Sequence, residues 1–348
     1  MELSVLQSAG LSAIAVLVLT LPFFIKKVEE DLEIFLFIMG VLAATISGMW
    51  NWHLIEEGFK EPFFISATVL CVGFVFKRFR DHCKICVLAC VKKIGHRKTV
   101  FAAILVLGLL SSVITAIIAA LILSQISANM HLTRRNELKF IVYGCFAIGL
   151  GAALTPIGEP LATIAIAKLK GAPHYADFFF LLRTLWMWII PGVLFLAFLG
   201  SKMPQLHESK TEEHIEKETY KSILQRAGKV YLFIMGLIFL GAGVKPLAEV
   251  TVALIPREGL YWINIISAVL DNATLVAAEM VPTMSQDTIV FLLMGLIVSG
   301  GLLIQGNIPN IICAGKIKIK SKEWAKTAFP VGIFMLLVYF ILLSVFVV

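Results

Sequence analysis

Long apolar segments recur along the whole chain, and they constrain its fold more than any other feature. Most approach the roughly 20 residues that a helix needs to cross a bilayer. Of the 348 residues, 59% are hydrophobic and 15% are charged, whereas a soluble domain carries about a quarter charged residues. We therefore expect an all-α, multi-pass integral membrane protein in contact with membrane lipid. The segments are 4–25, 32–50, 63–76, 100–126, 140–167, 178–199, 230–244, 261–284, 289–313 and 327–348.

The basic residues indicate how the chain is oriented. The formal net charge is +7, and the basic residues form short clusters between the apolar segments. Such clusters mark cytoplasmic loops, so no nucleic-acid partner is expected. The first apolar segment lacks a basic region before it, which predicts a retained helix rather than a cleaved signal peptide. We expect the protein in the plasma membrane of a prokaryotic cell.

The same charge pattern predicts a re-entrant hairpin at about 100–126. The basic residues Lys98 and Arg134 flank this single apolar segment. If both face the cytoplasm, the segment must enter and leave the membrane on the same side, with a turn near residues 111–115. Irregular backbone at this depth is tolerated where protein covers it or where it lines a watery cavity. A hairpin here therefore predicts a functional site at its tip.

The chain divides into two halves that we expect to be inverted repeats. The polar segment 201–229, with mixed charges, is predicted to be a cytoplasmic linker between residues 1–200 and 230–348. Each half is predicted to hold a re-entrant hairpin, at about 100–126 and 261–284, and an interrupted transmembrane helix, at about 140–167 and 289–313. Residues 111–115 (Ser-Ser-Val-Ile-Thr) align with 267–271 (Ser-Ala-Val-Leu-Asp), and Gly-Glu-Pro at 158–160 aligns with Gly-Asn-Ile-Pro at 306–309. Paired interruptions of this kind are typical of secondary transporters.

The first interruption carries a carboxylate. Thr155, Pro156, Gly158 and Glu159 precede a second proline, and two prolines and a glycine within five residues cannot continue a helix. Unwinding frees carbonyl groups as cation ligands and exposes the positive end of the next half-helix beside Glu159. A charged side chain at membrane depth costs about 2.5–3.5 kcal/mol on an insertion scale and is functional by default. Glu159 is therefore predicted to belong to an ion site.

The second hairpin supplies further oxygen ligands. Asp271 lies in the middle of an apolar segment, with Asn272 and Thr274 beside it and Ser267 before it. A hard monovalent cation such as sodium prefers oxygen ligands, and the same carboxylate can bind a proton instead. A group that binds either ion but not both predicts exchange. The neutral site residues expected from the other segments are Asn307, Asn310, Ser112 and Thr115.

These motifs resemble a known family. Residues 155–159 (Thr-Pro-Ile-Gly-Glu) resemble the Thr-Pro-Ile-Gly-Asp motif of NhaD-type sodium/proton antiporters, and 267–278 resemble their Asp-Asn motif with its Leu-Val-Ala-Ala tail. The chain is similar to the short cation-transporter relatives in this ion transporter superfamily. The resemblance implies inverted repeats, two re-entrant hairpins, homodimers and an elevator-like movement. The chain departs from the family at Glu159, where the family has Asp, and at Thr115-Ala116, where the antiporters have a first Asp-Asn pair.

Two other functions are alternatives to cation/proton exchange. An anion carrier of the dicarboxylate or arsenite type is the first alternative, although Glu159 and Asp271 argue against an anionic substrate. An intramembrane enzyme is a remote alternative. The segment His207-Glu208-Ser209-Lys210-Thr211 lacks the second histidine of a zinc protease, and Asp271 alone among the aspartates lies deep in an apolar segment. We expect no enzyme activity, no cofactor and no metal beyond a transported sodium ion.

Overall fold

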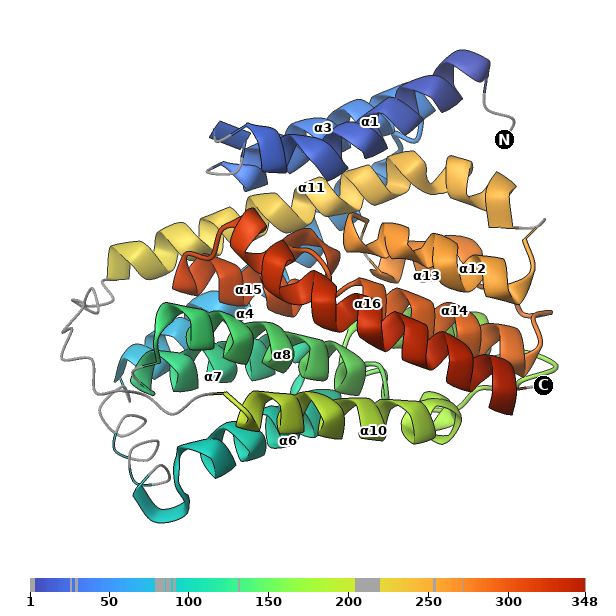
Figure 1. Cartoon of the computed structure of the whole chain (residues 1–348). Helices are drawn as coiled ribbons and strands as arrows, with labels where there is room; N and C mark the ends of the chain where they lie inside the picture. The colour runs from blue at the N-terminus through green and yellow to red at the C-terminus, as the bar shows by residue number, and fades with distance from the viewer. Residues whose placement is uncertain are drawn as a thin grey trace.

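The computed structural model describes an assembly of helices (Figure 1). It describes residues 4–25, 27–28, 31–78, 85, 89, 92–130, 132–203, 220–252, 255–270 and 272–347, and these contain α-helices and short 3₁₀-helices but no strand. Asp271 lies outside the described residues, as do Cys83, Cys86, Cys90 and residues 204–219 of the predicted linker.

Within the described part of the chain, four helices are long and apolar enough to cross a membrane. They are α6 (His96–Ile114), α10 (Phe180–Ser201), the part Ile223–Pro246 of α11 (Tyr220–Val252), and α16 (Ser321–Phe346). Their length and composition indicate a membrane protein. The described residues also form shorter apolar helices of 10–17 residues.

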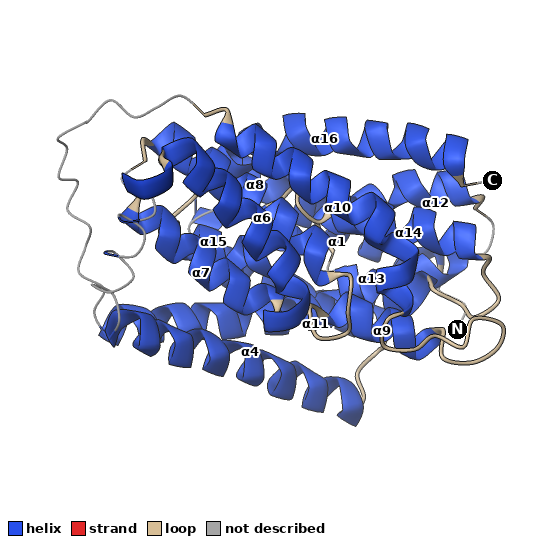
Figure 2. Ribbon diagram, turned by 90° about the horizontal axis from the view of Figure 1, so that it is seen from below, coloured by secondary structure: helices blue, strands red, loops and turns tan. Residues whose placement is uncertain are grey.

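The N-terminal helices lie around α11, above it and behind it in Figure 1. They are α1 (Val5–Phe24), α3 (Leu32–Ser47) and α4 (Trp52–Arg78). A side chain at Gly40 of α3 would collide with the backbone of Gly236 on α11, so these two helices meet at small residues, as membrane helices often do. Figure 2 shows α4 and α16 at opposite edges of the bundle.

Helix α4 begins earlier than the apolar segment 63–76 predicts. Its first turns are polar, and they carry the i,i+4 ion pair between Glu56 and Lys60. Pairs with this spacing support a helix that hydrophobicity alone does not reveal. The apolar segment 63–76 therefore covers only the C-terminal part of α4.

Two helices are interrupted where the sequence places glycine and proline. Helix α8 (Arg134–Ala152) ends before Pro156, and α9 (Pro160–Lys168) begins at the next proline. Helix α14 (Gln286–Ser299) is followed by the 3₁₀-helix η2 (Ile304–Gly306) and by α15 (Ile308–Ile317). The helices that follow the two interruptions, α9 and α15, each have a proline in their first two positions. The missing N–H of proline costs no hydrogen bond there, because the first N–H groups of a helix have no partner within it.

The chain reverses direction between α6 and α7 (Ala116–Asn129). Gly108 of α6 lies against Ala147 of α8, and Ser112, near the end of α6, accepts a hydrogen bond from Thr155, which follows α8, so α6 runs parallel to α8. In α7 the order is opposite, because Leu123 packs on Gly144 and Ser127 contacts Glu137 near the start of α8. We call α6 and α7 the first hairpin.

The turn of this hairpin is Thr115. Its backbone has φ 73°, in the left-handed region that favours glycine. The side-chain oxygen of Thr115 accepts a hydrogen bond from the backbone of Ile118 at 3.4 Å, which caps the start of α7. A polar side chain that caps the new helix is one reason why threonine is found at this strained position.

A second hairpin is formed by α12 (Arg257–Ile263), the 3₁₀-helix η1 (Asn264–Ala268) and α13 (Asn272–Glu279). Asn264 contacts Leu292 and Ser267 contacts Leu296, so η1 runs parallel to α14. Glu279, at the far end of α13, returns to the level of Asn264. The first arm of this hairpin therefore runs parallel to α14 and the second arm returns antiparallel to it. The first hairpin has the same orientation relative to α8.

The two interrupted helices run antiparallel to each other. Arg134 at the start of α8 donates to the carbonyls of Ile317 and Lys318 at the end of α15, both at 3.1 Å. Farther along, Cys145 contacts the carbonyl of Pro309. Arg134 also pairs with Glu323 of α16 at 2.8 Å, and its positive charge lies where the free carbonyls at a helix end favour a cation.

Candidate functional site

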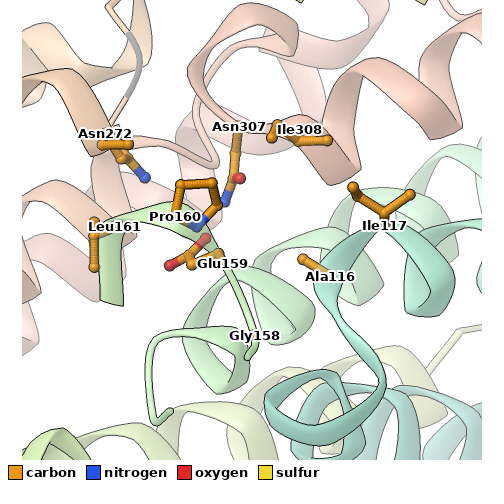
Figure 3. Close-up of a pocket in the computed structure, with 10 residues that line it drawn as sticks. Ala116, Ile117, Gly158, Glu159, Pro160, Leu161, Asn272, Asn307 and Ile308 are labelled. Atoms are coloured by element: carbon orange, nitrogen blue, oxygen red, sulfur yellow. The ribbon is translucent and has the colours of Figure 1, made fainter. Parts of the chain in front are cut away.

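A pocket of about 80 Å³ lies where the two hairpins meet the two helix interruptions (Figure 3). A buried water molecule needs a cavity volume of at least about 10–15 Å³. The pocket therefore has room for an ion and a few water molecules. Drug-sized ligands occupy sites several times larger. The lining residues are Ala116, Ile117, Gly158, Glu159, Pro160, Leu161, Asn272, Ala273, Asn307 and Ile308.

Four helices begin at this pocket. The first residues of α7, α9, α13 and α15 all line it. The start of a helix carries backbone N–H groups without partners in the helix and a partial positive charge. The four helix starts therefore create a positive potential, which stabilises an anion at the pocket and makes it a suitable place for a buried carboxylate.

Glu159 supplies that carboxylate. It precedes α9 with extended backbone (φ −155°, ψ 160°), and its side chain is 7% exposed. Figure 3 shows the carboxylate beneath Pro160, on the side of the pocket that faces the Asn307 amide. The adjacent Gly158 brings the backbone close to Ala152, and no larger residue fits there. The interruption thus turns Glu159 into the interior.

The first interruption is fixed to the tip of the first hairpin. The backbone N–H of Ala116 donates to the carbonyl of Gly158 at 2.9 Å. The buried hydroxyl of Thr155 donates to the carbonyl of Ser112, one turn before the hairpin reverses. The carbonyl of Pro156 accepts from the hydroxyl of Thr163 at 2.7 Å. Hairpin tip and interruption therefore position Glu159 together.

The second interruption is held by an amide. Asn310 of α15 is fully buried and donates from Nδ2 to the carbonyls of Gly300 and Leu303, both at 2.9 Å. These carbonyls follow the end of α14, and that of Leu303 also accepts from the backbone N–H of Gly306 at 3.3 Å. Asn307, which precedes α15, turns its amide into the pocket. Asn310 therefore supports the site without lining the pocket, whereas Asn307 lines it.

Asn272 brings a second amide to the pocket from the second hairpin. It is the first residue of α13 and is 3% exposed. Among the described residues, neither its Oδ1 nor its Nδ2 has a hydrogen-bond partner. A buried polar group without a partner costs about 1–3 kcal/mol. An amide that faces a pocket in this condition indicates a ligand or water there.

An equivalent hydrogen bond between hairpin and interrupted helix occurs in each half. The hydroxyl of Ser111 lies 3.0 Å from the carbonyl of Ile148 and 2.6 Å from that of Gly108 in its own helix, and the hydroxyl of Ser267 donates to the carbonyl of Leu296 at 2.9 Å. Each serine is the first residue of the aligned hairpin motif. Each acceptor lies the same number of residues before the glycine of its interruption, Gly158 or Gly306. The first arm of each hairpin therefore packs on its interrupted helix in the same register in both halves.

The residues predicted for the ion site fall into three groups. Gly158, Glu159, Asn272 and Asn307 line one pocket, although they come from three separate segments. A second group surrounds the pocket without lining it: Ser112, Thr115, Thr155, Pro156, Ser267 and Asn310. The third group lies outside the described residues and comprises Asp271 and the side chain of Thr274.

Sequence reasoning missed the apolar part of the lining. Ala116, Ile117, Pro160, Leu161, Ala273 and Ile308 carry no ligand chemistry in their side chains. The repeat alignment contained a signal for some of them, because Ala116 and Ile117 align with Asn272 and Ala273. Residues just after a polar motif at a helix start point into the same space as the motif.

Helices of membrane length around a buried, carboxylate-containing pocket define a helical membrane protein with an internal polar site. The chain belongs to the DUF1646 family, whose description is "Protein of unknown function" and whose model matches residues 8–346. A comparison with curated proteins finds no match.

Proposed function

We propose that the protein is a secondary transporter that exchanges a monovalent cation, with sodium as the first candidate, for protons across the membrane by alternating access. One observation carries the proposal. The carboxylate of Glu159 and the amides of Asn272 and Asn307 meet in one buried pocket at two helix interruptions. Paired interruptions form the substrate sites of many secondary transporters.

The relations between the helices support inverted repeats with re-entrant hairpins. In each half, the first arm of a hairpin runs parallel to the interrupted helix and the second arm runs antiparallel to it. The two interrupted helices run in opposite directions. Two copies of one unit inserted in opposite orientations have these relations, and alternating access then follows from movement of one part of the protein against the other.

The energetics favour an ionised Glu159 with a cation beside it. A charged residue at membrane depth costs about 2.5–3.5 kcal/mol on the insertion scale. The four helix starts contribute about 0.3–1 kcal/mol each, which together offset roughly the cost of one negative charge. The oxygens of Glu159, Asn272 and Asn307 then form the kind of ligand set that a hard cation prefers.

The four helix starts also favour a second function, an anion carrier. Helix N-termini bind carboxylate and phosphate groups directly. However, the carboxylate of Glu159 already occupies this positive potential. A dicarboxylate would add two further negative charges to a pocket with room for a few water molecules. Cation exchange is therefore the function that the geometry supports better.

Transport by purified protein in proteoliposomes tests the proposal. Sodium added outside is expected to move protons outward through the protein and change the pH inside, and a pH gradient should drive uptake of labelled sodium. Glu56→Gln, which changes an exposed carboxylate on α4, is the matched control for Glu159→Gln. Movement of a dicarboxylate or arsenite without any sodium or proton movement would establish the anion carrier instead.

The remaining parts of the proposal concern location and assembly. A multi-pass transporter of this kind acts in the plasma membrane of a prokaryotic cell, and we propose that it does so as a homodimer. Chemical cross-linking in native membranes tests the dimer. A protein that stays monomeric at every cross-linker concentration would refute it without affecting the pocket.

A further inference from the structure

A second buried carboxylate lies at the end of the second hairpin and has no place in the pocket. Glu279 is the last residue of α13 and is 2% exposed. Its side chain interacts with that of Asn264, the first residue of η1, which is fully buried. The Nδ2 of Asn264 also lies 3.5 Å from the carbonyl of Leu292 on α14. The carboxylate is therefore enclosed by the two arms of the hairpin and α14.

The two side chains leave a pair of acceptor atoms without donors. Among the described residues, neither Oε2 of Glu279 nor Oδ1 of Asn264 has a hydrogen-bond partner. An ionised carboxylate and an amide oxygen both accept hydrogen bonds and cannot donate them. A proton on the carboxylate changes this, because the resulting O–H group is a donor. A carboxylic acid and a primary amide can satisfy each other through two hydrogen bonds.

No described basic residue compensates a negative charge on Glu279. Helix α13 packs against α9, α11 and α14. Lys168 on α9 is exposed, and Asp287 on α14 lies near Arg257. The charged side chains described on α11 are Lys221, Lys229 and Lys245, and none forms an ion pair with Glu279. A buried, ionised carboxylate without a partner is costly, whereas the protonated form is neutral.

Glu279 is separate from the pocket. Asn272 begins α13 at the pocket and Glu279 ends the same helix, which places the two about 10 Å apart along the axis. Neither Glu279 nor Asn264 lines the pocket. In the first hairpin the aligned positions hold Leu123 and Gly108. The carboxyl–amide pair is therefore a feature of the second hairpin alone.

We propose that Glu279 and Asn264 form a proton-binding site separate from the pocket, and that Glu279 carries the proton exchanged for the cation. The first part stands on the geometry of the hairpin, and the second rests on the proposed function. The carboxylate takes up one proton from one side of the membrane and becomes a neutral acid. Loss of that proton to the other side restores the carboxylate, so charge and atoms balance over one cycle.

Infrared spectroscopy tests the site without any assay of transport. Full-length protein in lipid vesicles is titrated with acid and base while the carbonyl stretch of protonated carboxylic acids is recorded. We expect a pH-dependent band from a buried acid that is absent in Glu279→Gln, present in Glu279→Asp and shifted in Asn264→Ala. The surface variant Glu258→Gln should retain the band. A spectrum of Glu279→Gln identical to that of the unaltered protein would overturn the proposal.

Transport separates the two parts of the proposal. Glu279→Gln is expected to lower sodium-driven proton movement at least tenfold while it keeps the exchange of labelled for unlabelled sodium. Glu159→Gln should lose both. Full proton movement by Glu279→Gln would refute the role of Glu279 in exchange. If the unaltered protein moves no sodium at all, the proposed function fails, and the infrared band still decides whether the proton site exists.

Discussion

Glu159 and Asn307 occupy the same position in the two helix interruptions. Each precedes a helix with proline in its first two positions, and their backbones are nearly identical, with φ −155° and ψ 160° for Glu159 and φ −156° and ψ 146° for Asn307. Both line the pocket. The two positions therefore have the same backbone geometry but different side-chain chemistry: Glu159 supplies a carboxylate and Asn307 supplies a neutral amide.

Glu159→Gln is expected to abolish the charge of the first interruption while it preserves the shape of the side chain. Sodium-dependent proton movement in proteoliposomes should fall at least tenfold, which corresponds to about 1.4 kcal/mol. Thermal unfolding in detergent should change little, because the four helix starts roughly offset the cost of the buried charge that the amide removes. Normal exchange by this variant would remove Glu159 from the ion site.

The equivalence of the two positions gives a second prediction. Asn307→Asp alone should destabilise the protein by about 2.5–3.5 kcal/mol, because it adds a second charge at the same depth. The double variant Glu159→Gln, Asn307→Asp moves the charge across the pocket and is expected to regain much of that stability and part of the exchange. Thermal unfolding and sodium uptake measure the two effects. A double variant as unstable as Asn307→Asp alone would contradict the equivalence.

The interruptions could be predicted from the sequence because their causes are local. Each proline inside a helix costs a hydrogen bond, and here prolines cluster with glycines: α8 ends at Ala152, shortly before Pro156, α9 begins at Pro160, and α15 begins at Ile308, next to Pro309. The reversal at Thr115 was predicted from charge rather than from local sequence. The start of α4 was not predicted, because its first turns are polar and a search for apolar segments excludes them.

The repeated serine bond predicts equal effects in the two halves. Ser111→Ala and Ser267→Ala should each lower the free energy of unfolding by about 0.6 kcal/mol, a typical value for a hydrogen bond between membrane helices. Ser124→Ala is the matched control, since this buried serine donates only to its own helix, to Leu121. Its effect should be smaller. Unfolding in a detergent titration measures all three variants, and effects that differ severalfold between Ser111 and Ser267 would contradict a shared register.

The pocket itself could not be predicted in full, because it depends on contacts between distant segments. Sequence motifs indicated Glu159, Asn272 and Asn307, but the spacing of residues does not reveal that Asn310 donates to the interruption while Asn307 faces the pocket. Both residues are asparagines in one motif. Their roles separate because Asn307 precedes α15 in extended backbone and Asn310 lies within the helix, pointing back to Gly300.

Gly300 provides the last prediction, because a side chain at this position would enter the site. A Cβ atom there would lie 2.5 Å from Nδ2 of Asn272 and 2.9 Å from the carbonyl oxygen of Gly306. The Asn272 side chain can rotate away, but the backbone of Gly306 cannot move without disturbing the second interruption. Gly300→Ala is therefore expected to destabilise the protein by about 1–3 kcal/mol, the usual cost of overpacking, and to weaken sodium-driven proton movement.

Gly315→Ala is the matched control for this substitution. Gly315 lies in α15 beyond the interruption, and nothing lies within 4 Å of an added Cβ atom. Alanine inside a helix is more favourable than glycine by about 0.5–1 kcal/mol, so this variant should be as stable as the unaltered protein or more stable, with normal exchange. Thermal unfolding and proteoliposome transport measured side by side separate the two cases. Equal behaviour of the two alanine variants would show that Asn272 does not lie against Gly300, and the pocket would lose its second amide.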